Sequence, residues 1–356
     1  MTTAFATNHW HDVTLPLADE PFASAWRGYA ATAAREGTES VLRRFVQLRF
    51  PIAAGTSATD EYQAAVRRGV VRHDAGMIEL RRPNAIRIRL QPTAAGSIPV
   101  LIIPERDDFV SLVQAFVHRN EPVTISPAMG ACVVAGYNNW DRVAALRSYA
   151  EFETGGASLS EENWLRRWRA LMPRKELYQD RFIMLSTGPY SAVDATALGL
   201  SSIEWLRLSL TIRLEHECAH YFTRRVFGAM RNSLHDELLA DYAGIVAACG
   251  RYRADWFLHF MGLDAYPRYR KGARLENYGD GAAPDSAASI ALQQRINDAA
   301  WQLEAFDAQL PLAARPMLGR AAVLAAIADC SLDQLAASDG ASRLRDAYER
   351  MRTALT

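Results

Sequence analysis

The sequence predicts an α+β fold in which a small β-sheet region is followed by a mainly helical C-terminal half. Short β-rich runs, punctuated by Pro, Gly and Asn, are concentrated between about residues 78 and 136. After Gly136 the sequence is mainly helical in character, with clear helix start and stop signals. The 356 residues suffice for one large domain or two ordinary ones. We therefore expect an N-terminal α/β region, 1–155, of unknown role and a mainly helical region, 156–356, which can also form one integrated unit.

In the N-terminal region, helices are expected first and strands after them. Residues 20–70 are rich in Ala and Arg at helical spacing, and the sequence ERDDFVSLVQAFVHRN predicts a further helix at 105–120. The runs expected to form strands are GMIEL at 76–80, AIRIRLQ at 85–91, SIPVLIIP at 97–104, EPVTIS at 121–126 and ACVVAGY at 131–137. One more strand is expected at 181–187, RFIMLST, before a Gly-Pro turn.

The C-terminal region carries the longest predicted helix. Ser201 and Glu204 form a capping-box pattern, and no Gly or Pro occurs before Gly228, which predicts a helix of about seven turns. Between Leu206 and Leu214 apolar and polar residues alternate as in a strand. However, the whole uninterrupted segment from Ser202 to Phe227 is too long for an ordinary strand. Ser160 is a predicted N-cap for the helix EENWLRRWRAL. Further helices are expected at about 233–248, 288–309, 317–328 and 338–354, with a loop at 279–287.

Composition excludes several classes of function. Lys plus Arg and Asp plus Glu balance at 40 each, so no overall charge attracts nucleic acid or an anionic membrane. The N-terminal residues lack the pattern of a signal peptide, and the apolar runs are far shorter than a membrane span. The four cysteines show no Cys-x-x-Cys spacing, which argues against a disulfide framework and a thiolate metal site. We expect a cytoplasmic protein that binds neither nucleic acid nor membrane; its oligomeric state cannot be inferred.

Residues 216–220 read His-Glu-Cys-Ala-His, the HExxH pattern. On a helix, His216 and His220 project from one face, close enough to bind one Zn²⁺. Glu217 then lies beside the open position of the metal, where it can act as a general base toward a zinc-activated water. Cys218 points roughly away from this face and is expected in the core.

The next predicted helix supplies further carboxylates. Glu237 and Asp241 share one face of it, and small residues on the same face would let the two helices approach closely: Ala240, Gly244 and Ala248. Glu237 could complete the ligand set, while Asp241 accepts a hydrogen bond from the outward ring N–H of a ligand histidine. We expect His235 and Asp236 to be solvated at the start of this helix, where the helix dipole favours an acidic residue.

These residues resemble the gluzincins, a class of zinc metallopeptidases in which HExxH is followed on the next helix by Glu-x-x-x-Asp. The resemblance covers about residues 200–250, and Gly228 and Asn232 provide positions for a tight reversal between the helices. It implies a zincin-like scaffold with Zn²⁺ held by His216, His220 and Glu237, Glu217 as the general base, and Asp241 behind a ligand histidine. It also implies a peptide or protein substrate that pairs with the edge of the small sheet, for which 181–187 is the candidate strand.

Other residues are candidates for contact with a substrate. Arg213 and Arg224 project near the same side of the helix as the histidines, where they could bind a carboxylate or stabilise an oxyanion, although ordinary ion pairing also explains them. The candidates for a neutral oxyanion donor, each also explained by packing, are Tyr221, Tyr242, Tyr252 and His259.

Two alternatives to a zinc hydrolase remain. One is a non-catalytic, metal-stabilised interaction or scaffold protein whose N-terminal 150 residues recognise a partner. Glu217 argues against it, because a purely structural metal site does not need that carboxylate. The other is a metal-free helical interaction protein in which the HExxH pattern is accidental.

Overall fold

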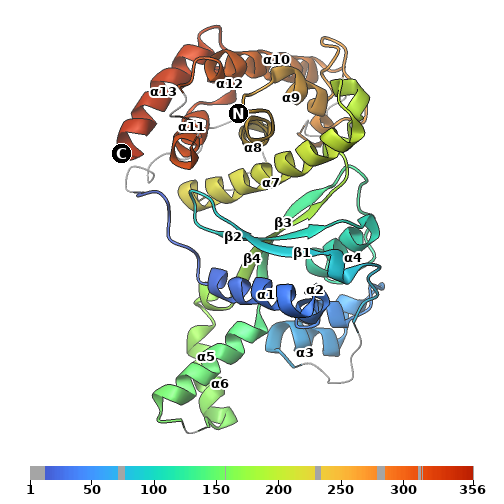
Figure 1. The fold of residues 1–356 in the computed structure, drawn as a ribbon, viewed down its shortest axis with the longest axis vertical. Helices are drawn as coiled ribbons and strands as arrows, with labels where there is room; N and C mark the ends of the chain where they lie inside the picture. The colour runs from blue at the N-terminus through green and yellow to red at the C-terminus, as the bar shows by residue number, and fades with distance from the viewer. Residues whose placement is uncertain are drawn as a thin grey trace. The chain divides into compact units, whose positions relative to one another are not determined.

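The structure, a computed structural model, describes residues 13–70, 77–156, 158–228, 234–278, 285–311, 314 and 316–355. It confirms an α+β fold with a four-stranded sheet and a mainly helical C-terminal half (Figure 1). The chain forms two compact units. The sheet unit consists of Asp19–Pro92 and Ser97–Thr187, and the helical unit consists of Gly188–Thr356 with Thr93–Gly96 and residues 13–18.

The units divide at Thr187 and Gly188, whereas the sequence suggests a boundary near residue 155. Strand order in the sheet is β1-β2-β4-β3. The strands are β1 (Arg87–Gln91), β2 (Ile98–Ile103), β3 (Ala131–Asn138) and β4 (Gln179–Ser186). Because β4 pairs parallel with β2 and antiparallel with β3, it belongs to the same unit as strands that come much earlier in the chain.

The position of β4 also contradicts one prediction about substrate binding. The sequence analysis expects residues 181–187 to form a sheet edge that an extended peptide could join. That prediction is wrong, because β4 has a strand hydrogen-bonded on each side, and the edge strands are β1 and β3.

Two other predicted strands are absent from the described residues. The segment 121–126 is not a strand; Pro122 and Pro127 enclose only four residues, and proline cannot donate a hydrogen bond to a sheet. Residues 77–80 likewise form no strand, and Gly76 of the same run lies outside the described residues. Ile78 instead donates one backbone hydrogen bond to Leu48, at 2.7 Å, and packs against the hydrophobic core.

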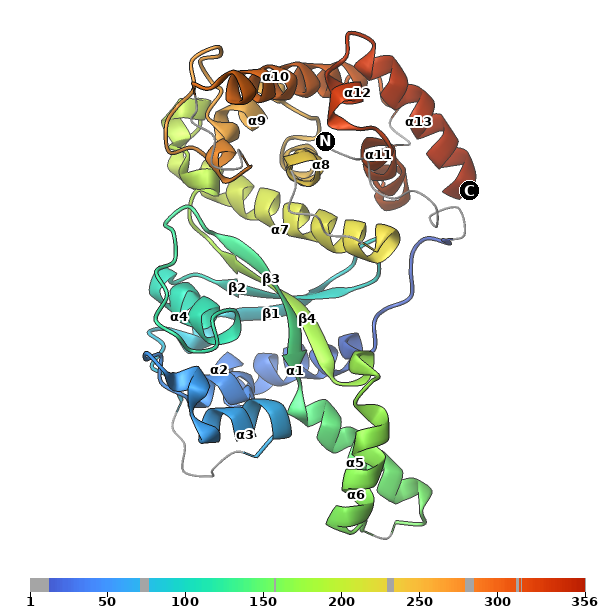
Figure 2. The same cartoon turned by 180° about the vertical axis from the view of Figure 1, so that it is seen from behind.

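In the sheet unit, helices α1 (Phe22–Glu36) and α4 (Arg106–Phe116) pack against the sheet and share one hydrophobic core with it (Figure 2). Trp26 and Phe182 lie in this core with ring centroids 5.0 Å apart. The predicted N-cap Ser160 accepts a hydrogen bond from the backbone of Asn163 at 3.3 Å. The remaining helices of the unit are α2 (Thr38–Leu42), α3 (Asp60–Arg68), α5 (Trp140–Glu153) and α6 (Glu161–Leu171).

The long helix predicted in the C-terminal half is α7 (Ser202–Phe227). Its N-cap, Ser201, accepts a hydrogen bond from the backbone N–H of Glu204 at 3.3 Å, and Gly228 ends it in the left-handed conformation, at φ 68°. Helical capping therefore prevails over the strand-like alternation of apolar residues. Asn232 and most of the predicted loop 279–287 lie outside the described residues.

The helix that follows, α8 (Leu234–Cys249), lies at the centre of the helical unit, where α7, α9 and α11 pack against it (Figure 1). Most of its residues are buried, so even its charged side chains are removed from water. The other helices of this unit are α9 (Ala254–Met261), α10 (Ala287–Asp307), α11 (Met317–Asp329), α12 (Leu332–Ala336) and α13 (Gly340–Leu355). Within the described ranges, no helix has the length and apolar character needed to cross a membrane.

The crossing of α7 and α8 depends on Gly244. A Cβ atom at this position would lie 2.7 Å from the carbonyl oxygen of Ile212 and 2.9 Å from its Cγ2 atom. The backbones can approach this closely only because residue 244 has no side chain. One of the small residues that the sequence places on this face is thus directly at the helix contact.

We predict that Gly244→Ala destabilises the protein by about 1–3 kcal/mol, because the added methyl group forces the two helices apart. Gly28→Ala is the matched control: Gly28 lies inside α1, and a Cβ there meets no atom within 4 Å. This control should be neutral or stabilising by up to about 1 kcal/mol. Urea unfolding followed by circular dichroism measures both, and equal stability of Gly244→Ala and the wild type would contradict the prediction.

Candidate metal centre

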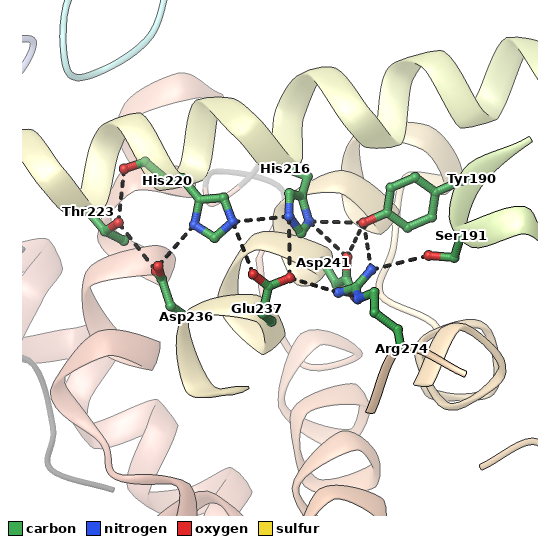
Figure 3. A network of polar contacts seen from close by, with 9 residues as sticks. All are labelled: Tyr190, Ser191, His216, His220, Thr223, Asp236, Glu237, Asp241 and Arg274. Carbon is green, nitrogen blue, oxygen red and sulfur yellow. Dashed lines mark hydrogen bonds and ion pairs between the residues drawn. The ribbon is translucent and has the colours of Figure 1, made fainter. Parts of the chain in front are cut away.

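Helices α7 and α8 bring His216, His220 and Glu237 together in a buried group that could hold a metal ion (Figure 3). The Nε2 atoms of the two histidines are 3.1 Å apart. Glu237 Oε2 lies 3.6 Å from His216 Nε2, and Glu237 Oε1 lies 3.6 Å from His220 Nε2. Tetrahedral coordination with metal–ligand distances of about 2.0–2.2 Å separates the ligand atoms by about 3.3–3.6 Å. The three residues therefore present their donor atoms at the spacing that a single ion requires.

Each histidine is oriented by a carboxylate on α8. His216 Nδ1 lies 2.9 Å from Asp241 Oδ1, and His220 Nδ1 lies 3.0 Å from Asp236 Oδ2. Since a carboxylate accepts hydrogen bonds, the proton of each neutral ring is on Nδ1 and the lone pair is on Nε2. Two lone pairs would then face each other across 3.1 Å. Two facing lone pairs are unfavourable, so a bound cation would stabilise them, as would a proton on one Nε2 atom, which the raised pKa of His220 favours.

The charges in this region also favour a cation. Asp236 and Asp241 are fully buried and Glu237 is 8% exposed. Arg274 contacts two of them, with Nη2 at 3.1 Å from Glu237 Oε2 and 2.6 Å from Asp241 Oδ2. Three buried carboxylates around two imidazoles concentrate negative charge at this point, and this charge would stabilise a divalent cation.

The pKa values of two candidate ligands, Glu237 and His220, are shifted in opposite directions, and both shifts favour the charged form. Burial acts to raise the pKa of Glu237, but the hydrogen bond to His220 and the charge of Arg274 outweigh it and hold that pKa well below its usual range. Burial acts to lower the pKa of His220, but Asp236 and Glu237 raise it well above its ordinary value. The carboxylates thus stabilise positive charge on His220, and Arg274 with the histidines stabilises the ionised form of Glu237.

Glu217 follows His216 on α7 and is 8% exposed. Burial raises the pKa of its carboxyl above the ordinary value, while the positive potential of His216 and His220 acts in the opposite direction. Glu217 is not one of the three residues whose donor atoms converge. A carboxylate thus lies within electrostatic reach of the candidate ligands but outside the group that they form.

The structure places Asp241 where the sequence analysis puts it, but the expectation for its neighbours on α8 is wrong. Asp236 and His235 are expected to be solvated, yet they are 0% and 2% exposed. Asp236 contacts His220, and His235 Nε2 lies 2.9 Å from the carbonyl oxygen of Ile327. The reason is that α8 is surrounded by other helices, so its first turn does not face water.

The sequence analysis misses Tyr190, which belongs to the turn after the predicted Gly-Pro pair. Its hydroxyl donates to Asp241 Oδ1 at 2.5 Å and lies 3.0 Å from His216 Nδ1. It also accepts a hydrogen bond from Arg274 Nη1 at 3.0 Å. Neither Tyr190 nor Arg274 belongs to a sequence motif, and the only local signal is the turn that precedes Tyr190.

The residues proposed from sequence for substrate contact have other contacts in the structure. Arg213 is buried and donates hydrogen bonds to the carbonyl groups of Gly188 and Pro189, so it holds the turn that carries Tyr190. Arg224 is exposed on α7. The hydroxyl of Tyr242 donates to Asp307 at 2.6 Å. Tyr221 accepts a hydrogen bond from Arg225, and Tyr252 is buried against Tyr242. His259 is partly exposed on α9.

We predict that Asp236→Asn and Asp241→Asn each lower metal affinity by about 10- to 100-fold, because each carboxylate orients one ligand histidine. Competition with a chromophoric chelator measures the affinities. Asp307→Asn is the control, since Asp307 is equally buried but accepts hydrogen bonds from Tyr242 and the backbone of Tyr252. Wild-type affinity in Asp236→Asn would show that the contact with His220 does not support metal binding.

Comparison with known proteins places the chain in a family without assigning a function. No curated protein and no solved structure matches it. Residues 1–339 match the model of a family described as a family of unknown function, DUF7005. Since this match spans nearly the whole chain, the protein belongs to the DUF7005 family.

Proposed function

We propose that the protein is a zinc-dependent hydrolase, most specifically a metallopeptidase with a zincin-like active site. The observation that carries this proposal is the convergence of His216, His220 and Glu237, with Glu217 next to His216 on α7 and electrostatically coupled to both histidines. Two imidazoles and one carboxylate form a ligand set used by catalytic zinc sites, which keep a fourth position open for water or substrate. Structural zinc sites are closed by four protein ligands instead.

The donor set supports zinc over the hard divalent cations. Ca²⁺ and Mg²⁺ favour sites made of oxygen ligands, whereas two of the three donors here are imidazole nitrogens. Ferrous iron also accepts two histidines and one carboxylate, but its chemistry does not require a further carboxylate next to the ligands. Glu217 therefore favours a hydrolytic site that uses zinc.

The residues of the chain have distinct roles in this proposal. A bound zinc ion would supply Lewis acidity, lowering the pKa of a water molecule toward 7 and polarising a carbonyl group. Glu217 accepts a proton from the attacking water and later delivers it to the leaving amine. Asp236 and Asp241 hold the Nδ1 protons, so that His216 and His220 present Nε2 to the ion.

A peptide or protein substrate is proposed because a carboxylate that can return a proton to an amine suits cleavage of an amide bond. The interior position of β4 gives no support to pairing of that substrate with residues 181–187. The alternative, a metal-stabilised scaffold protein, has no need of Glu217. An ionisable side chain that is only 8% exposed is costly to keep without a role.

We predict one zinc ion per chain in protein purified without chelators. Elemental analysis measures the stoichiometry. Glu237→Ala should remove tight binding because it leaves only two ligands, whereas Glu276→Ala, at an exposed position that accepts a hydrogen bond from the backbone of Gly272, should not change it. Protein that lacks zinc, and takes up none on titration, would exclude the proposed function.

We predict that Glu217→Gln keeps its zinc but loses hydrolytic activity by about 10²-fold or more, the scale of a lost general base. Substrates are first found by incubating the wild type with cell extract and searching for zinc-dependent new N-termini. Glu215→Gln, on the same helix but near Arg320, is the control. Cleavage by Glu217→Gln at the wild-type rate would refute the assigned role, and a zinc-loaded wild type that cleaves nothing would favour the scaffold alternative.

A further inference from the structure

Arg274 joins three parts of the helical unit at the metal centre, although its own segment supplies none of the candidate ligands (Figure 3). Nη1 donates to the Tyr190 hydroxyl at 3.0 Å and to Ser191 Oγ at 3.2 Å. Nη2 donates to Glu237 Oε2 at 3.1 Å and to Asp241 Oδ2 at 2.6 Å. The side chain is 17% exposed. One guanidinium therefore ties the turn after β4 to two carboxylates of α8.

These contacts require the planar fork of arginine. Each of the two Nη atoms carries two N–H groups, and each of those four groups has an acceptor. The Nε atom is buried and has no hydrogen-bond partner among the described residues. A lysine ammonium has the same charge but only three donors on one atom. It cannot reach four acceptors that are spread along the edge of a planar group.

The contact with Glu237 is asymmetric. Both oxygens lie equally near the candidate ligands, Oε2 at 3.6 Å from His216 Nε2 and Oε1 at 3.6 Å from His220 Nε2, but the Arg274 hydrogen bond, at 3.1 Å, goes to Oε2. A carboxylate with both oxygens free can bind one ion through both of them. Such two-oxygen binding would occupy the position that a catalytic site keeps open for water. The guanidinium competes for Oε2 and so favours binding through Oε1 alone.

We propose that Arg274 is a positioning residue for the metal centre: its ion pair with Oε2 keeps Glu237 a one-oxygen ligand and leaves one coordination position open. This inference rests on the metal site proposed above. Arg274 is not expected to contact a substrate, because the four N–H groups of its Nη atoms already donate hydrogen bonds within the protein.

A role in positioning and a role through charge alone predict opposite results. A positive charge near the ion repels it, so if only charge mattered, Arg274→Gln would strengthen metal binding and Arg274→Lys would leave it unchanged. Positioning predicts that both substitutions let Glu237 bind through two oxygens, which changes the coordination number. Both should also weaken binding by about 10- to 100-fold, because Asp241 is no longer held against His216.

The test compares wild type, Arg274→Lys and Arg274→Gln, with Arg270→Lys and Arg270→Gln as controls. Arg270 lies four residues earlier, pairs with Asp264 at 3.2 Å, and its side chain is 47% exposed. Zn²⁺ affinity is measured by chelator competition, and the visible absorption of Co²⁺-loaded protein reports the coordination number, being stronger for four ligands than for five. We expect weaker Zn²⁺ binding and weaker Co²⁺ absorption only in the Arg274 variants.

The possible outcomes separate this inference from the proposed function. Wild-type affinity and absorption in Arg274→Lys would overturn the positioning role and leave the metal site intact. A loss of thermal stability of the metal-free protein with an unchanged Co²⁺ spectrum would also overturn it, as a merely structural role. A wild type that binds neither Zn²⁺ nor Co²⁺ would overturn both proposals.

If the Arg274 variants do not fold, Tyr190→Phe provides a second test, because it removes one hydrogen-bond acceptor of Nη1. This variant should weaken the Co²⁺ absorption, and an unchanged spectrum would again overturn the inference.

Discussion

The burial of three carboxylates on α8 is the constraint on which the arrangement of the candidate metal centre depends. An ionised carboxylate removed from water is unfavourable unless it is hydrogen-bonded or paired. Asp236 is therefore hydrogen-bonded to His220, and Asp241 is hydrogen-bonded to His216 and Tyr190. Arg274 forms ion pairs with Glu237 and Asp241. Because these bonds use Nδ1 of each histidine, the two Nε2 atoms are left to converge on one point with Glu237.

The turn that carries Tyr190 shows how much of the helical unit supports this centre. Ser191 and Ala192 have positive φ values, 50° and 54°, a conformation that costs a non-glycine residue about 1–3 kcal/mol. Hydrogen bonds from α7 offset this cost: Ser209 accepts from the backbone of Tyr190, and Arg213 donates to the carbonyl groups just before it. The strained turn is thereby held where the Tyr190 hydroxyl reaches Asp241.

The main elements of the site follow from local rules, and for that reason sequence reasoning finds them. Residues four apart on a helix share a face, so HExxH places His216 and His220 together once Ser201 and Gly228 define the helix. The same rule relates Glu237 to Asp241 on α8. The reasoning fails for Asp236, because the exposure of a helix terminus depends on which other helices surround it and not on the residues of its own turn.

The sequence by itself thus determined the α+β class, the two site helices and the convergent ligand candidates, since capping and periodicity involve residues only a few positions apart. Tertiary structure alone decided the interior place of β4, the division of the chain after Thr187, and the contacts of Tyr190 and Arg274 with the candidate ligands and Asp241. Strand order depends on pairing between distant segments, such as β2 with β4. The partners of Arg274 likewise lie 33 to 84 residues away along the chain, so only packing of the whole helical unit brings them to one guanidinium.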